Sequence, residues 1–168
     1  MGYVHDTHMS QYIPPTAMMG TTGTYTQAAG AVTSTIAFHR AAAASTGVIN
    51  IPVTLPSNSV ALKGAYLKSI EVDYELLLAA ATSITFSLNK VTRGADTAVA
   101  VVSAVTVTQS LAASAGAETQ DQHKCTVTLT TPEWIDNDCY YLLVMTAVCG
   151  GTVTIDVLGA VANYTLRV

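Results

Sequence analysis

The alternation of apolar and polar side chains with a period of two constrains the fold of this chain most. In residues 70–76, four apolar side chains alternate with three acidic ones. Successive side chains of a β-strand point to opposite faces, so this pattern predicts a strand with one buried and one solvated face. The same period recurs in residues 32–38, 84–88, 125–129 and 153–157. A helical period is nearly missing, which predicts an all-β protein.

Turn residues divide the chain into strands of similar length. Signals of this kind lie at residues 56–59, 92–96 and 131–138 and at Gly150-Gly151, where Pro, Gly, Asn and Asp favour tight connections. Residues 140–148 are apolar on both faces, as in a central strand. We therefore expect an antiparallel β-sandwich or jelly roll of about eight strands over residues 31–168.

Residues 1–30 lack a sustained period and are interrupted by Pro14-Pro15, Gly20 and Gly23. We interpret them as an extended N-terminal arm, separate from the sandwich, with a frayed tail as the alternative. Aromatic, thioether and aliphatic side chains are suited to contacts with a partner. The candidate interaction residues are Tyr3, Tyr12, Ile13, Met18, Met19 and Tyr25. On this hypothesis, removal of residues 1–25 abolishes attachment and leaves the sandwich folded.

Only 11% of the residues are charged, and the formal net charge is −4. Average proteins carry about 25% charged residues, and a free monomer needs them for solubility. We therefore expect this chain to associate, as a homo-oligomer. Seven basic residues without a cluster do not provide the contacts that nucleic acids or anionic membranes require. The apolar stretches are also shorter than the ~20 residues of a membrane span, so neither partner is expected.

No constellation of catalytic residues is recognisable in the sequence. The pair His5 and His8 lacks the glutamate of a zinc helix, and Asp136-Asn137-Asp138 lacks the glycine and glutamate of a calcium loop. The acidic row of residues 71–75 is typical of a solvated strand face. Three cysteines without a C-x-x-C motif favour buried thiols. We expect no enzymatic activity, no cofactor and no metal.

Several segments resemble small virion structural proteins of tailed bacteriophages. The resemblance covers most of residues 48–168 and is carried by residues 51–53 (IPV), 62–74 (LKGAYLKSIEVDY), 89–96 (NKVTRGAD), 131–138 (TPEWIDND) and 158–166 (LGAVANYTL). By architecture, the chain is similar to capsid decoration, or cement, proteins. The resemblance implies a jelly roll that forms a homotrimer on the lattice of the major capsid protein and grips it with an arm. None of the segments is a functional motif, so it assigns no site residue.

These inferences predict a structural virion protein on the capsid surface, made in the host cytoplasm. The main hypothesis is a decoration protein that stabilises the capsid. A self-assembling coat, tube or filament subunit is an alternative with the same requirements. A further alternative is a head-fibre, receptor-binding or carbohydrate-binding β-sandwich, because the chain has eight tyrosines and one tryptophan, Trp134.

Overall fold

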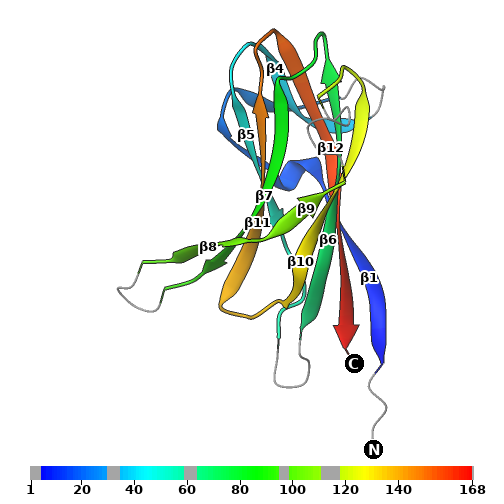
Figure 1. The fold of residues 1–168 in the computed structure, drawn as a ribbon, viewed down its shortest axis with the longest axis vertical. Coiled ribbons are helices and arrows are strands. Elements are labelled where there is room, and N and C mark those ends of the chain that lie inside the picture. Colours follow the sequence, from blue (N-terminus) through cyan, green and yellow to red (C-terminus); the bar gives the residue numbers. More distant parts are fainter. Residues whose placement is uncertain (1–4, 30–34, 59–63, 95–98, 111–117, 168) are drawn as a thin grey trace, which may run out of the picture.

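The computed structural model describes residues 5–29, 35–58, 64–94, 99–110 and 118–167 (Figure 1). The described residues form twelve strands and one short 3-10 helix. The elements are β1 (Asp6–Ile13), η1 (Pro15–Ala17), β2 (Met19–Thr22), β3 (Tyr25–Ala29), β4 (Ile36–Ala43), β5 (Gly47–Val53), β6 (Ala65–Leu77), β7 (Ser83–Thr92), β8 (Val101–Val105), β9 (Val107–Gln109), β10 (Gln122–Trp134), β11 (Cys139–Val148) and β12 (Val153–Arg167). No helix in this part of the chain has the length and apolarity to cross a bilayer.

The strands form two antiparallel sheets that pack face to face. The seven-stranded sheet has the order β3-β4-β12-β6-β10-β9, and β1 pairs with the second half of β12. The five-stranded sheet has the order β2-β5-β11-β7-β8. From β4 to β7 and from β10 to β12, successive strands alternate between the sheets, so β4-β12-β6-β10 faces β5-β11-β7-β8. This is the eight-stranded jelly roll, and the fold class expected from the sequence is confirmed.

The core lies between the sheets and follows the period of two. In β6, Ile70, Val72, Tyr74 and Leu76 are fully buried, whereas the alternating Glu71, Asp73 and Glu75 face outward. Burying a side chain of this size contributes about 1.5–3 kcal/mol. The alternation thus fixes the register of each strand, since a slip by one residue would bury the carboxylates.

A bulge in β12 depends on a glycine. The register against β6 shifts between Val157 and Gly159, and Gly159 has a φ of 151°. A Cβ at this position would lie 2.6 Å from the hydroxyl oxygen of Tyr12, whose side chain covers the bulge. Only glycine fits here, because both the backbone conformation and the close approach of Tyr12 exclude a side chain.

The N-terminal segment differs from the predicted arm. Residues 6–29 pair within both sheets, as β1 on β12, β2 on β5 and β3 on β4. Ile13 and Met18 belong to the hydrophobic core, with exposed fractions of 2% and 4%. The prediction failed because these strands lie at sheet margins, where β1 buries a single side chain and leaves no alternation to detect. The expected boundary at residue 30 therefore does not separate an arm from the sandwich.

This placement predicts a loss of stability on truncating Ile13. We expect Ile13→Ala to lower the free energy of unfolding by about 2–4 kcal/mol, because it opens a cavity in the core. Met9→Ala, in the same strand at a position that is 42% exposed, is expected to change it by less than about 0.5 kcal/mol. Urea unfolding followed by circular dichroism measures both. If both substitutions lower the free energy of unfolding by equally small amounts, the hypothesis of a separate N-terminal arm is supported again.

Candidate functional site

The outward faces of the two sheets differ sharply in charge. On the seven-stranded sheet, Lys124 Nζ lies 3.5 Å from Glu71 Oε2 and 3.8 Å from Asp73 Oδ1. Asn163 Nδ2 donates to Glu71 Oε1 at 2.9 Å, and Ser10 Oγ donates to Asn163 Oδ1 at 2.7 Å. These contacts join β1, β12, β6 and β10 into one polar surface, which is the solvated face that the acidic row predicts.

The outward face of the five-stranded sheet carries no charged side chain on the strands that the structure describes. Its central strand, β11, turns Tyr141, Leu143, Met145 and Ala147 inward, where all are buried. The outward residues on the five strands are neutral or apolar and half-buried to exposed, apart from the buried Val91. They include Met19 on β2, Val48, Asn50 and Pro52 on β5, Tyr140, Leu142, Val144, Thr146 and Val148 on β11, Thr85, Ser87, Asn89 and Val91 on β7, and Val102 on β8. We call this surface the uncharged face.

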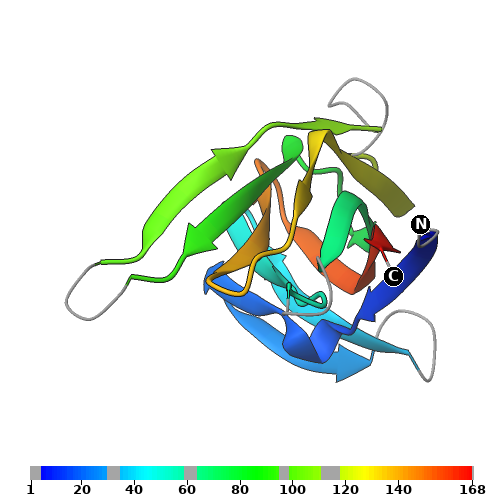
Figure 2. The same cartoon turned by 90° about the horizontal axis from the view of Figure 1, so that it is seen from below.

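The hairpin of β7 and β8 extends the uncharged face beyond the sandwich (Figures 1 and 2). Val101 and Val102 are 64% and 61% exposed, and Val99 just before them is 86% exposed. Val91 is 5% exposed but lies outside the main core cluster, in register with Tyr140 and Val102. A two-stranded ribbon that presents valines to solvent in this way is suited to contacts with another molecule.

The six candidate interaction residues do not form one surface. Ile13 and Met18 are in the core, and Tyr3 lies outside the described residues. Tyr25 stacks on Phe38 with ring centroids 5.0 Å apart. The Tyr12 hydroxyl donates to the carbonyl oxygen of Leu158 at 3.0 Å. Met19, 55% exposed, is the member that lies on the uncharged face.

A polar cleft lies where the chain crosses from β8 in one sheet to β9 in the other. Its volume is about 300 Å3, and it is lined by Ala104, Val105, Thr106, Thr130, Thr131 and Glu133. On one side, the Thr130 amide donates to the Thr106 carbonyl at 3.0 Å. On the other, β10 departs from its register with β6 between Thr128 and Glu133, which opens the space. We call this space the Glu133 cleft.

Two side chains from the five-stranded sheet hold the Glu133 carboxylate. The buried Tyr141 hydroxyl donates to Oε2 at 2.6 Å, and Lys90 Nζ lies 3.6 Å from the same oxygen. Lys90 also lies 3.9 Å from Asp136 Oδ2 and 5.8 Å from the centroid of the Tyr141 ring. Burial, and then the bond to Glu133, raise the pKa of Tyr141 well above its usual range, so the phenol keeps its proton and remains a donor.

Three further polar arrangements were not recognised in the sequence. His39 Nδ1 and Asp156 Oδ1, across β4 and β12, are 2.6 Å apart, and Asp156 is 2% exposed. Arg40 is 1% exposed and donates to the Ser45 carbonyl and to Cys149 Sγ. Tyr66 and Trp134, also in register, contact each other with ring centroids 4.6 Å apart. All three join residues that are distant in sequence, so only strand pairing brings them together.

The candidate metal ligands fall into one group in the described residues. One ligand atom each of Asp136, Asp138 and Cys139 lies within 4.8 Å of the others, and Asp138 is exposed. Cys139 Sγ contacts Asp138 Oδ1 at 3.3 Å. His5 and His8, the other pair considered, do not join a group of three. Exposed carboxylates of this kind occur commonly in proteins without a metal role, so the group by itself indicates no metal centre.

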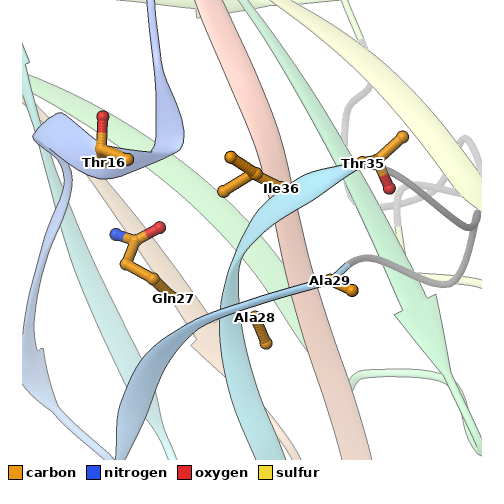
Figure 3. A pocket seen from close by; sticks show the side chains of 6 residues that line it. All are labelled: Thr16, Gln27, Ala28, Ala29, Thr35 and Ile36. Atoms are coloured by element: carbon orange, nitrogen blue, oxygen red, sulfur yellow. The ribbon is translucent and has the colours of Figure 1, made fainter.

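A second, open hollow lies between η1 and the β3–β4 edge of the seven-stranded sheet (Figure 3). Its volume is about 440 Å3, and it is lined by Thr16, Gln27, Ala28, Ala29, Thr35 and Ile36. Gln27 Nε2 donates to the Pro15 carbonyl at 2.9 Å, which ties β3 to η1. The hollow contains no charged side chain among its lining residues and offers little to orient a polar ligand.

Comparisons with known proteins give distant structural similarities and no matching family. No protein-family model and no curated protein sequence matches the chain. One similar solved structure is a carbohydrate-binding module of the β-sandwich superfamily, with a TM-score of 0.45 and 11% identity over 91% of this chain and 54% of that one. Another is TmCBM61 in complex with β-1,4-galactotriose, with a TM-score of 0.39 and 6% identity over 92% and 86%. The chain thus spans about half the length of the first structure, and the likeness is too distant to transfer a ligand or a role.

The buried tyrosines predict a loss of stability at alkaline pH. Burial raises the pKa of Tyr25 from 10.0 to about 12 and raises those of Tyr74 and Tyr141 further. Above pH 10 the unfolded chain releases these protons and the folded chain holds them, so the free energy of unfolding decreases as pH rises. Urea unfolding at about pH 8.5 and about pH 11 measures this decrease. Phenolate absorbance showing that all eight tyrosines of the folded protein ionise together near pH 10 would contradict it.

Proposed function

We propose that the protein is a non-catalytic structural subunit that assembles with further copies of itself through the uncharged face. One observation carries this proposal: the outward side of the described five-stranded sheet has no charged residue, although it is not covered by another part of the described chain. Antiparallel sheets with one solvated side normally place polar and charged residues there. An uncharged sheet face with exposed apolar side chains is typical of a surface that becomes buried in an assembly.

The size of the uncharged face suits a stable interface. Its strands have 4, 7, 10, 10 and 5 residues, and at about 3.4 Å per residue and about 4.8 Å between strands they give a footprint of roughly 590 Å2. Stable protein interfaces bury about 800 Å2 on each partner. Contact over this face can therefore supply most of the interface between two subunits.

The distribution of charge favours a second copy as the occupant. The acidic row Glu71, Asp73 and Glu75 lies on the opposite sheet, so two uncharged faces meet without bringing these carboxylates together. A strongly charged partner would find no counter-charge on the uncharged face. Val102 on β8 continues the same surface, whereas Val101, one position earlier, points to the opposite side of the hairpin.

The sequence resemblance to phage structural proteins and the low charge support a role for this structural subunit in a virion. On this proposal the subunit is a capsid decoration protein bound to the lattice of the major capsid protein on the capsid surface. Two identical faces that meet form a two-fold contact, so a homotrimer requires a second contact besides the uncharged face. A self-assembling coat, tube or filament subunit would use the same face. Because residues 6–29 pair within their own chain, we assign self-association to the uncharged face and not to an N-terminal arm.

Charge placed on the uncharged face is expected to dissociate the assembly. Val144, half-buried on the central strand β11, is opposite Asn50 and Ser87 in register. A lysine there would have to be desolvated without a partner, so Val144→Lys is expected to yield monomers in size-exclusion chromatography with light scattering. The parent protein is expected to form a discrete oligomer or a larger assembly.

Val161→Lys provides the matched control. Val161 is half-buried on β12 and faces outward on the charged sheet, opposite Glu71. Val161→Lys also introduces a lysine in a central strand, and we expect it to leave the oligomeric state unchanged. A monomeric parent protein, or equal dissociation by both variants, would refute assembly through the uncharged face.

A further inference from the structure

The Glu133 cleft, at the β8 edge of the five-stranded sheet, has the chemistry of a small-molecule site. Three threonines, Thr106, Thr130 and Thr131, line it together with Glu133. Each hydroxyl can both donate and accept a hydrogen bond, whereas an ionised carboxylate only accepts. Ala104 and Val105 add an apolar wall. The combination matches a ligand that carries several hydroxyl groups beside C–H surfaces.

The carboxylate is held in place before any ligand arrives. In the described residues, the bond from Tyr141 and the ion pair with Lys90 both go to Oε2 of Glu133. The other oxygen, Oε1, is thus left to accept a hydrogen bond from a ligand. Tyr141 is fully buried in β11, so its hydroxyl fixes the carboxylate from the rigid core. A preorganised acceptor loses less conformational entropy on binding.

Charge balance points to a neutral ligand. Lys90 lies within ion-pairing distance of both Glu133 and Asp136, and it offsets part of their negative charge. A cationic ligand at this carboxylate would be repelled by the Lys90 ammonium. A neutral hydroxyl group can instead donate to the carboxylate, and hydrogen bonds to an ionised acceptor are stronger than those between neutral groups.

We propose that the Glu133 cleft binds a neutral, polyhydroxylated small molecule, namely a single sugar ring. The volume of about 300 Å3 is at the lower end of small-molecule pockets, which suits one ring and not a long chain enclosed in the cleft. The ring can be a free sugar or the end of a polysaccharide that projects into solvent. The inference does not depend on self-assembly, because the cleft residues lie apart from the central strand of the uncharged face.

The experiment uses the full chain and two kinds of probe. Isothermal titration calorimetry with a panel of neutral hexoses and N-acetylhexosamines tests free sugars, and affinity electrophoresis in soluble polysaccharides tests chain ends. We expect binding of at least one probe, with a dissociation constant on the order of 1 mM for a single ring. Amide chemical shifts in labelled protein should change at Thr106, Thr130 and Thr131.

Two variants and one matched control locate the site. Glu133→Gln is expected to weaken binding about tenfold or more, because it removes the charged acceptor. Thr131 is exposed, and valine has nearly the same shape as threonine. Thr131→Val is therefore expected to weaken binding severalfold without disturbing Tyr141. Thr128→Val is exposed on the same strand but outside the cleft, and binding should be unchanged. Thermal unfolding verifies that each variant is folded.

The outcomes separate this inference from the proposed assembly. If Val144→Lys is monomeric and still binds the sugar, both proposals hold. If Val144→Lys has the oligomeric state of the parent protein and still binds the sugar, only the assembly proposal fails. The sugar site is refuted if no probe binds at tens of millimolar. It is also refuted if Thr131→Val and Glu133→Gln bind as the parent does, if the shifts change at Tyr66 and Trp134 instead, or if methylammonium binds in preference to the sugars.

Discussion

The antiparallel pairing of β6 with β12 is the constraint on which the rest of the structure depends. These two long strands run side by side through the middle of the seven-stranded sheet, and each carries one neighbour or more on its other edge. Their inward side chains fill the core, so their register decides which residues face the second sheet. The bulge at Gly159 bends β12 and divides it into two halves. The first half pairs with β4, and the second half pairs with β1.

This arrangement gives the two outward faces different roles. One sheet carries the acidic row and Lys124 on a solvated polar surface. The other is neutral, and the β7–β8 hairpin extends it outward (Figure 2). The Glu133 cleft lies at a third place, where the chain passes between the sheets after β8. Assembly and ligand binding can therefore be proposed independently on one small jelly roll.

The period of two predicts the architecture well wherever a strand has one buried face. It predicts β6, β7 and β10, and the fully apolar residues 140–148 predict a central strand, which β11 is. The prediction was wrong for residues 6–29, because marginal strands such as β1 bury too few side chains to produce an alternation. The period of two also gives no sign that the chain changes sheets at Thr106, between β8 and β9.

The all-β class, the inward residues of the long strands and the scarcity of charge follow from local spacing and composition, so they can be read from the amino acids alone. The uncovered position of the outward side of β11, and the contacts of Glu133 with Tyr141 and Lys90, exist only once the strands have paired and the sheets have packed. The physical reason is that strand order and crossovers set long-range neighbours. A period of two records which side of a strand a residue occupies, but not which strand lies across from it.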